Sequence, residues 1–206
     1  DYYASRGLGD VYKRQLLLVA CSLSAKAGVV KISGSLKQFG LDRVSMNSDG
    51  IAAEVYHDRT IEIILDSNGR FDLKLKLKQP AYYKVGHNTL YLTPGDDLEI
   101  IFNRNTTKTT FNGKGIEANN YLRNSAKLSG WEIAKIGREL NEFGLPKEKV
   151  SFEVYRYKVD SIVDASLDAL AHLTAVTPEF RELEQIRLEA YRLATYLDYF
   201  SVGQLS

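Results

Sequence analysis

The chain has 206 residues, of which 44% are hydrophobic and 26% charged, so it can bury a core without help from disulfides or metals. Residues 28–206 are almost neutral, with 23 basic and 24 acidic side chains. A neutral surface does not attract a phosphate backbone, and we expect no nucleic-acid partner. The single cysteine, Cys21, excludes an intramolecular disulfide, a Cys-x-x-Cys redox pair and a cysteine-rich zinc site within this chain.

The first 27 residues are typical of sequence that does not belong to the mature fold. Residues 1–15 precede an apolar run without an initiator methionine and resemble translated adapter sequence, so we leave them out of the fold prediction. Residues 16–27 combine the apolar run Leu-Leu-Leu-Val-Ala with the small residues that precede a cleavage site, which predicts the remnant of a signal peptide. This run is too short to span a bilayer.

Cys21 allows two interpretations of this segment. Cleavage before Gly28 would release the chain into the periplasm, whereas Leu18-Val19-Ala20-Cys21 also resembles a lipobox, which would make Cys21 a lipidated N-terminus. A buried strand with a core cysteine is a third reading. We expect export to the cell envelope, with membrane attachment only if Cys21 is lipidated.

From Val29 to Phe111 apolar and polar residues alternate with a period near two, and turn residues separate the runs. This pattern predicts an antiparallel β-sandwich or barrel of about seven to eight strands over residues 28–112. Strands are predicted at Val30–Leu36, Arg43–Met46, Ala52–Tyr56, Thr60–Leu65, Arg70–Lys78, Tyr82–Val85, Thr89–Leu92 and Leu98–Asn103.

Two turns mark the clearest hairpins, at residues 66–69 (Asp-Ser-Asn-Gly) and 93–96 (Thr-Pro-Gly-Asp). In the second, Pro94 fixes φ and Gly95 accepts a positive φ. Within residues 70–78 apolar residues alternate with charged ones, which predicts a strand with one solvated face. The lysines on that face also discourage edge-to-edge pairing.

After Gly115 the period becomes helical, and we expect an all-helical segment of about three helices over residues 113–206, with no further strand. The fold class is therefore α+β. The first predicted helix carries Ile133, Ile136, Leu140 and Phe143 and ends at residues 144–146. The second carries Val159, Ile162, Val163, Leu167, Leu170 and Leu173.

The third predicted helix begins with Thr177 as N-cap, Pro178 in the first helical position and Glu179 just inside. We expect the three helices to pack antiparallel. The chain ends directly after the third helix, which favours a piece of a longer protein. The apolar stripe expected to form the packing face of the third helix is Leu183, Ile186, Ala190, Leu193, Leu197 and Phe200.

Residues 113–118 fit the dinucleotide-binding pattern G-x-G-x-x-A at a strand-to-helix junction. A Rossmann unit needs a buried apolar strand before the glycines and a second parallel strand after the helix. Here Lys108-Thr109-Thr110 precedes and only helices are expected to follow. We predict a linker turn at this position and no cofactor.

No other motif predicts chemistry. The histidines, His57, His87 and His172, are scattered and lack a second metal ligand at a suitable spacing. The acids at residues 96, 97 and 99 could form an acid pair or a calcium site, but we expect Asp96 to bind a backbone amide of its own turn. The sequence predicts no catalytic residue and no metal site.

Tyrosines give the one indication of a binding surface. Tyr82, Tyr83 and Tyr91 lie on neighbouring predicted strands. A tyrosine ring buries area at an interface while its hydroxyl stays hydrated, so these three form a candidate partner surface. Ordinary packing in a half-buried core is the alternative role.

Four segments together resemble a known family. They are residues 30–36 (VKISGSL), residues 80–83 (PAYY), residues 92–98 (LTPGDDL) and residues 111–115 (FNGKG), the last leading into Asn119-Asn120-Tyr121-Leu122. In order and spacing they resemble the N-terminal region of TlpA-like thiol-disulfide oxidoreductases of Gram-negative envelopes. The resemblance covers residues 16–206.

The resemblance implies a β-sandwich and a helical linker that precede a thioredoxin-fold domain, whose Cys-x-x-Cys pair reduces disulfides in the periplasm. Nothing in this chain matches that pair, so no catalytic residue carries over. The resemblance implies a non-catalytic accessory region that positions the reductase domain, binds an envelope partner or forms a homodimer. A stand-alone envelope binding or structural protein, as a lipoprotein, is the alternative.

Overall fold

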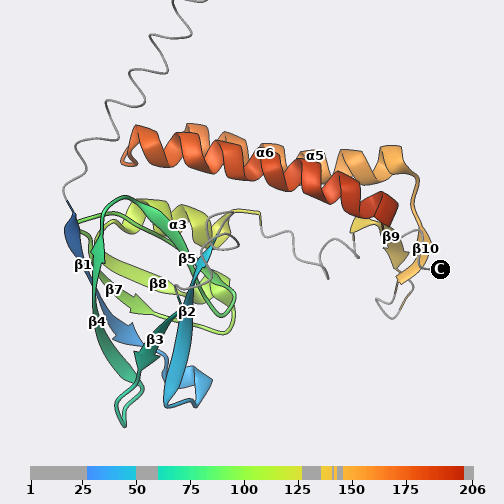
Figure 1. Cartoon of the computed structure of the whole chain (residues 1–206). Helices are drawn as coiled ribbons and strands as arrows, with labels where there is room; N and C mark the ends of the chain where they lie inside the picture. Colours follow the sequence, from blue (N-terminus) through green and yellow to red (C-terminus); the bar gives the residue numbers. More distant parts are fainter. Residues whose placement is uncertain (1–26, 50–59, 127–135, 141, 143–145, 202–206) are drawn as a thin grey trace, which may run out of the picture. The chain divides into compact units, whose positions relative to one another are not determined.

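The computed structural model describes residues 27–49, 60–126, 136–140, 142 and 146–201. The chain divides after Gly115 into two compact units, named here the sandwich unit and the helical unit (Figure 1). Within the described residues the sandwich unit holds eight strands in two sheets, and the helical unit holds three helices. The α+β class predicted from the sequence is confirmed.

Seven of the eight predicted strands fall on strands of the structure, and Ala52–Tyr56 lies outside the described residues. The additional strand is β8, which pairs with β7. The bounds are β1 Gly28–Ser35, β2 Arg43–Asp49, β3 Thr60–Ile64, β4 Arg70–Leu77, β5 Ala81–Val85, β6 Asn88–Leu92, β7 Asp97–Ile101 and β8 Thr110–Lys114.

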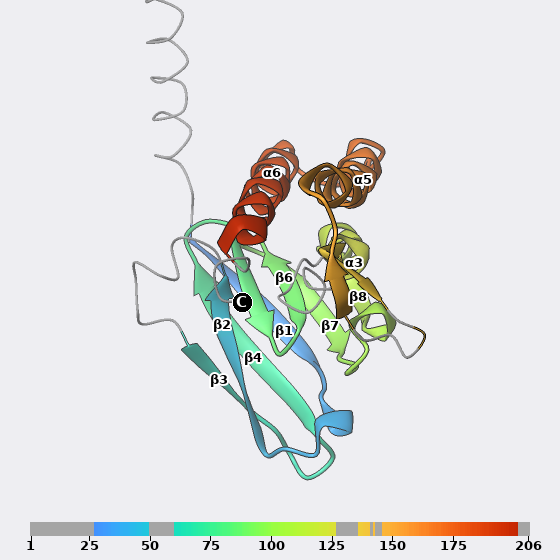
Figure 2. The same cartoon turned by 90° about the vertical axis from the view of Figure 1, so that its right-hand side faces the viewer.

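The two sheets each contain four strands, in the orders β4-β1-β7-β8 and β3-β2-β5-β6 (Figure 2). The second sheet is antiparallel throughout. The two hairpins predicted at residues 66–69 and 93–96 are wrong as hairpins, because these turns connect β3 to β4 and β6 to β7, which belong to different sheets. In the first sheet β1 pairs antiparallel with β4 and parallel with β7, with Gly34 opposite Ile100. The long connection from β1 to β7 accommodates this parallel pair.

The core of the sandwich unit is built from the inward faces of both sheets. Val30 and Ile32 of β1 alternate with the exposed Lys31 and the half-buried Ser33, as period-two patterning requires. In β4, Phe71 and Leu77 are buried while the intervening charged side chains are exposed, which confirms the solvated face. Further fully buried side chains are Leu36, Met46, Tyr83, Val85, Leu90, Leu92, Leu98, Ile100 and Phe102.

Polar contacts fix the loops of this unit. The predicted turn at Asp66 is present, with Asp66 Oδ1 accepting from the amides of Asn68 and Arg70, each at 2.8 Å. A buried pair joins β6 to the connection between β7 and β8, where Thr109 Oγ1 donates to Asn88 Oδ1 at 2.7 Å. Thr109 Oγ1 also accepts from the amide of Asn103 at 3.1 Å, which satisfies a buried hydroxyl on both sides.

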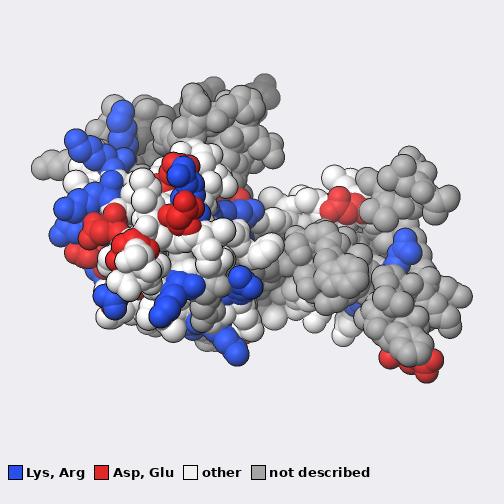
Figure 3. All heavy atoms as spheres, turned by 90° about the horizontal axis from the view of Figure 1, so that it is seen from below, with Lys and Arg blue, Asp and Glu red and all other residues white. Residues whose placement is uncertain are grey.

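Charges on the outer faces are mixed in sign. Figure 3 shows lysines and arginines interspersed with acidic side chains over one face of the sandwich unit. Cross-strand pairs of this kind join exposed side chains, such as Lys31 to Asp97 at 3.4 Å and Arg43 to Glu62 at 3.5 Å. Exposed pairs of this type contribute little to stability, so the buried apolar faces hold the unit together.

The helical unit contains α3 (Ile116–Asn124), α5 (Phe152–Ala171) and α6 (Pro178–Ser201). It also contains two short antiparallel strands, β9 (Arg138–Leu140) and β10 (Pro146–Lys149). The expectation of no further strand after Gly115 is therefore wrong. The predicted helix through Ile133 to Phe143 is wrong from residue 138 onward, and residues 133–135 and 143 lie outside the described residues. Three residues of β9 are too few for an apolar period to distinguish a strand from a helix.

The helical hairpin of α5 and α6 has the predicted cap at the start of α6. Thr177 Oγ1 accepts from the amide of Phe180 at 3.1 Å, which confirms the predicted N-cap. Arg181 donates from α6 to the carbonyls of Leu170 and Leu173, so its guanidinium satisfies the free carbonyl end of α5. The two helices therefore run antiparallel and side by side (Figure 1).

The predicted packing face of α6 is wrong. Leu183, Ile186, Leu193, Leu197 and Phe200 are 37–67% exposed, and Ala190 is exposed as well. The buried positions of α6 lie on the opposite side and mix apolar with polar side chains, which hides this face from a search for apolar residues. They are Phe180, Glu184, Leu188 and Thr195.

Replacement of Gly34 by alanine tests the parallel pairing of β1 with β7. A Cβ at Gly34 would lie 1.8 Å from the carbonyl oxygen of Ile100, so the two strands would have to separate. We expect Gly34→Ala to lower the free energy of unfolding by roughly 3 kcal/mol or more, measured by urea denaturation. The matched control is Gly40→Ala, which has φ +63 but no atom within 4 Å and should lose only about 1 kcal/mol. Equal losses would contradict the strand contact.

Candidate functional site

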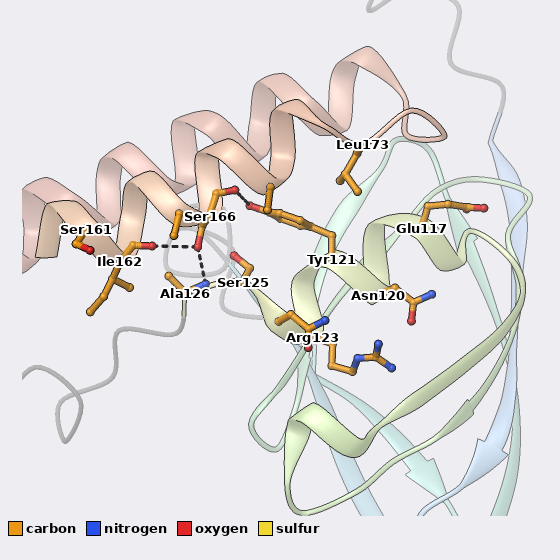
Figure 4. Close-up of a pocket in the computed structure, with 13 residues that line it drawn as sticks. Glu117, Asn120, Tyr121, Arg123, Ser125, Ala126, Ser161, Ile162, Ser166 and Leu173 are labelled. Atoms are coloured by element: carbon orange, nitrogen blue, oxygen red, sulfur yellow. Dashed lines mark hydrogen bonds between the residues drawn. The ribbon is translucent and has the colours of Figure 1, made fainter. Parts of the chain in front are cut away.

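A cavity of about 770 Å³ lies within the helical unit, between α3 and α5 (Figure 4). Its α5 wall consists of small and apolar residues, which leaves room next to the helix backbone. Its α3 wall adds polar and charged side chains. The residues that line it are Glu117, Asn120, Tyr121, Arg123, Asn124, Ser125, Ala126, Ser161, Ile162, Ala165, Ser166, Ala169 and Leu173.

Ser166 ties the two walls of the cavity together. Its hydroxyl accepts from the amide of Ala126 at 3.0 Å and donates to the carbonyl of Ile162 at 3.3 Å. Its carbonyl accepts from the phenol of Tyr121 at 2.9 Å, and Figure 4 shows these bonds converging on one turn of α5. These hydrogen bonds hold the end of α3 against the middle of α5, so Ser166 and Tyr121 have a structural role.

Tyr121 is a hydrogen-bond donor at neutral pH. Burial raises the pKa of its phenol to about 12, and the nearby Glu184 carboxylate also raises it. The hydroxyl therefore keeps its proton and donates to the Ser166 carbonyl. The ring packs edge-on against Phe180, with centroids 6.0 Å apart.

Ser125 and Glu184 form the one serine–carboxylate contact at this cavity among the described residues, at 3.3 Å. Glu184 is fully buried, and Arg187 donates to both of its oxygens at 2.6 Å. Nucleophilic catalysis by serine needs a base that is free to accept the proton and donors for an oxyanion. Here the carboxylate already holds a bidentate arginine, so the arrangement supports packing and not acyl transfer.

A second cluster of charged side chains, named here the Arg192 clasp, joins the middle of α6 to α5. The guanidinium of Arg192 donates to Asp160 at 2.9 Å and to Asp164 at 2.6 Å, and lies 3.1 Å from Glu189. Tyr196 donates to the same carboxylate of Asp160. Since the Arg192 side chain is only 17% exposed, removing its acidic partners would leave a charge without compensation inside the hairpin.

The protonation states of the clasp follow from these contacts. Burial alone would lower the pKa of Arg192, but the bonds to Asp164 and Asp160 outweigh it and raise that pKa. Burial also raises the pKa of Tyr196, and the Asp160 carboxylate adds to that effect. Arginine stays charged and tyrosine stays neutral across the physiological range, so the clasp is a fixed structural contact and not a proton-transfer group.

The tyrosines predicted as a partner surface lie on β5 and β6. Tyr82 and Tyr91 stand opposite each other, with ring centroids 5.0 Å apart. Tyr83 is 2% exposed and Tyr91 3% exposed, which leaves Tyr82 as the half-exposed member of the three. The rings of Tyr83 and Tyr91 are packed in the core, which was the alternative role for these residues. Binding of a partner at Tyr82 stays a prediction.

The remaining candidates do not converge. Asp96 Oδ2 accepts from the amide of Thr93 at 2.7 Å, which confirms its predicted role in the turn. Its neighbour Asp97 pairs with Lys31 on the exposed surface. His87 and His172 are exposed, while Cys21 and His57 lie outside the described residues.

The segment with the G-x-G-x-x-A pattern forms the end of β8 and the start of α3. Gly113 belongs to β8, which pairs antiparallel with β7, and Gly115 has φ +99 immediately before the helix. A Cβ at Gly115 would lie 2.7 Å from the carboxyl carbon of Asp96, so the glycine serves a tight junction. In a dinucleotide site the strand before the glycines pairs in parallel with a later strand, whereas β8 pairs antiparallel with β7.

Within the described residues no group of three or more His, Cys, Asp and Glu side chains could hold a metal ion. No helix in the described part combines the length and apolar character needed to cross a membrane.

Comparison with protein families, curated proteins and solved structures finds no match to this chain.

Sequence reasoning missed both the cavity and the Arg192 clasp. The spacing of Asp160 and Asp164 by four residues places both carboxylates on one side of a helix, and this signal was available. The partner arginine is distant in sequence, so only the packing of α5 against α6 brings it to them.

Substitution of Arg192 by glutamine tests the clasp. We expect Arg192→Gln to lower the free energy of unfolding by roughly 2–3 kcal/mol, because Asp160 and Asp164 would lose their shared cation at a partly buried position. Chemical denaturation measures the loss. The matched control is Arg156→Gln, which removes an exposed pair with Asp160 at 3.9 Å and should cost less than about 0.5 kcal/mol. A loss no larger than that of the control would refute a stabilising clasp.

Phenylalanine substitutions at Tyr121 and Tyr155 test whether the raised pKa of these buried phenols makes the stability of the fold depend on pH in the alkaline range. Burial raises the pKa of each from 10.0 to about 12 in the folded chain, with a contribution from Asp198 at Tyr155. The unfolded chain therefore releases these protons first, so the stability contribution is complete below pH 10 and is lost as the pH rises toward 12.

The free energy of unfolding is measured by denaturation at several pH values in this window. It should fall less steeply with rising pH in Tyr121→Phe and in Tyr155→Phe than in the wild type. Tyr157→Phe is the matched control, since the Tyr157 side chain is 75% exposed, and it should keep the wild-type slope. An unchanged slope in the two buried variants would contradict the assignment.

Proposed function

We propose that this chain is a non-catalytic accessory region of a periplasmic thiol-disulfide oxidoreductase, which positions the reductase domain or binds its partner. The observation that carries the proposal is the Arg192 clasp, which uses ionisable side chains to hold α5 and α6 together as one stiff element. An α-helix of 24 residues such as α6 is about 36 Å long. A helical pair of this length and rigidity suits a spacer between domains.

Two features support a positioning role over catalysis. Three polar residues at the cavity, Ser166, Tyr121 and Ser125, are engaged in contacts between α3, α5 and α6. The residues from β1 to α3 carry the segments that resemble the TlpA-like region, and that resemblance supplies the redox context.

The source gene provides the first experiment. If the proposal is right, the reading frame beyond Ser206 continues into a thioredoxin-fold domain with a W-C-x-x-C motif. A stop codon directly after Ser206, together with lipid labelling of Cys21, would instead support a stand-alone envelope lipoprotein.

A kinetic comparison then tests positioning in the parent protein. We expect the 206-residue chain alone to reduce insulin no faster than background, whereas the parent reduces both insulin and a small disulfide such as oxidised glutathione. Arg192→Gln in the parent should slow the reduction of insulin, the protein substrate, by about tenfold, because a loosened hairpin misplaces the reductase domain. The rate with the small disulfide should stay within about twofold, since that substrate needs no docking.

Arg156→Gln serves as the control in this assay and should leave both rates unchanged. Equal loss of both rates in Arg192→Gln would show damage to the reductase domain itself and would contradict a positioning role. Insulin reduction by the isolated chain would also refute the proposal.

A further inference from the structure

The chain contains two Asn-Gly pairs, Asn112-Gly113 on β8 and Asn68-Gly69 in the turn between β3 and β4. In such a pair the backbone nitrogen of the glycine can attack the side-chain carbonyl carbon of the asparagine, because glycine has no Cβ that blocks the approach. Whether this happens in a folded protein depends on what the glycine nitrogen contacts. The two pairs differ in this respect.

At Asn112 the two groups that would react already face each other. The amide of Gly113 donates to Oδ1 of Asn112 at 3.0 Å. Since a carbonyl bond is about 1.2 Å long, the Gly113 nitrogen lies no more than about 4.2 Å from Cγ of Asn112, the carbon that it would attack. Only a small movement separates this arrangement from a near-attack geometry, in which reacting atoms are about 3–3.5 Å apart.

The backbone at Gly113 holds the pair in place. Gly113 has φ +102, in the region that favours glycine, and a Cβ there would lie 2.1 Å from the carbonyl oxygen of Asp97. Its strand, β8, pairs with β7 and is the last strand in the order β4-β1-β7-β8. The pairing therefore fixes the conformation of Gly113 while its amide is turned to the side chain of Asn112.

Asn68-Gly69 has the same two residues but different contacts. The amide of Gly69 donates to the carbonyl oxygen of Asp66 at 2.9 Å, and the amide of Asn68 donates to the Asp66 carboxylate at 2.8 Å. Gly69 also packs closely against Lys37, since a Cβ at Gly69 would lie 2.8 Å from Cα of Lys37. The nitrogen of Gly69 would have to leave this turn before it could attack Asn68.

We propose that Asn112 is a site of spontaneous deamidation through a cyclic imide, whereas Asn68 is protected as long as the chain is folded. The Gly113 nitrogen forms a bond to Cγ of Asn112, and the side-chain NH₂ group leaves with the Gly113 proton as ammonia. One water molecule then opens the imide at either of its two carbonyls, which gives aspartate or isoaspartate. No atom changes its oxidation state, so water is the only co-reactant.

The modification would weaken the pairing of β8 with β7. Both products place a negative charge opposite Glu99, the residue that pairs with Asn112, and like charges at such positions destabilise an antiparallel pair. Isoaspartate also adds one carbon to the backbone ahead of α3. The junction at Gly115 has little room for a longer chain, because a Cβ there would lie 2.7 Å from Asp96. All of these contacts lie within the sandwich unit, so the reaction does not depend on the proposed redox role.

Incubation of the full 206-residue chain in mildly alkaline buffer, followed by tryptic digestion and mass spectrometry, tests the site. The two Asn-Gly pairs lie in separate tryptic peptides, residues 60–70 and 109–114. Deamidation raises the mass of a peptide by about 1 Da, and a sample without incubation corrects for reaction during digestion. We expect the peptide with Asn112 to gain this mass at least about fivefold faster than the peptide with Asn68.

The same incubation in concentrated urea supplies the reference. In the unfolded chain neither glycine nitrogen is held by the fold, so the two rates should agree within about threefold. Asn112→Gln is the matched variant, because its amide lies one methylene further from the backbone and closes a five-membered imide no longer. It should abolish the mass gain of peptide 109–114 and leave the rate at Asn68 unchanged.

The stability of the modified chain tests the effect on β8. We expect incubated protein to unfold at a lower urea concentration than fresh protein. Asn112→Asp carries the charge without the additional backbone carbon, so it should lower the midpoint less, and added salt should restore part of its loss. Equal rates at Asn112 and Asn68 in the folded chain, or a folded chain in which Asn112 stays unmodified while it reacts in urea, would overturn the proposed site. A deamidated chain as stable as the fresh one would overturn the weakened pairing.

Discussion

The helical hairpin is held by one mostly buried cation and the carboxylates that neutralise it. Arg192 projects from α6 toward α5 with 17% of its side chain exposed, and Asp160 and Asp164 supply the compensating carboxylates. Asp160 is 30% exposed and Asp164 63% exposed, so these ion pairs are partly hydrated, and they favour the register of the two helices in which the groups meet. Apolar contacts alone, such as those of Val159 and Leu188, would allow the helices to slide by a turn.

This constraint explains why the inner face of α6 is mixed and its outer face is apolar. Glu184 and Thr195 lie on the buried side, where Arg187 binds the Glu184 carboxylate and Tyr155 donates to the Thr195 carbonyl. The large apolar residues of α6 lie on its exposed side; they are Leu183, Ile186, Leu193, Leu197 and Phe200. The hairpin is thus a two-sided element, with one side closed by hydrogen bonds and ion pairs and the other side apolar.

The sandwich unit follows a simpler rule. Its strands alternate in and out, its turns use Asp, Pro and Gly at the expected places, and its core comes from both sheets. One less regular feature is the parallel contact of β1 with β7, which requires Gly34 because any Cβ would meet the Ile100 carbonyl. The folding of this unit does not call on any of the ionisable groups that hold the helical hairpin.

The sequence by itself determined the class, most of the strands, the turns at residues 66–69 and 93–96 and the cap at Thr177, because each depends on neighbours within a few residues. It took both turns for hairpins, whereas each connects strands of different sheets, which only the strand pairing decides. It also identified the apolar residues of α6 but assigned them to the core. Only the tertiary structure decided which side of α6 faces α5, since that choice rests on Asp160 meeting Arg192, 32 residues away. The strand β9 was missed for a related reason: its pairing with β10, and not its local period, gives Arg138–Leu140 its conformation. Long-range pairing of polar groups leaves no periodic signal in a sequence, and it is this kind of contact that shapes the helical unit.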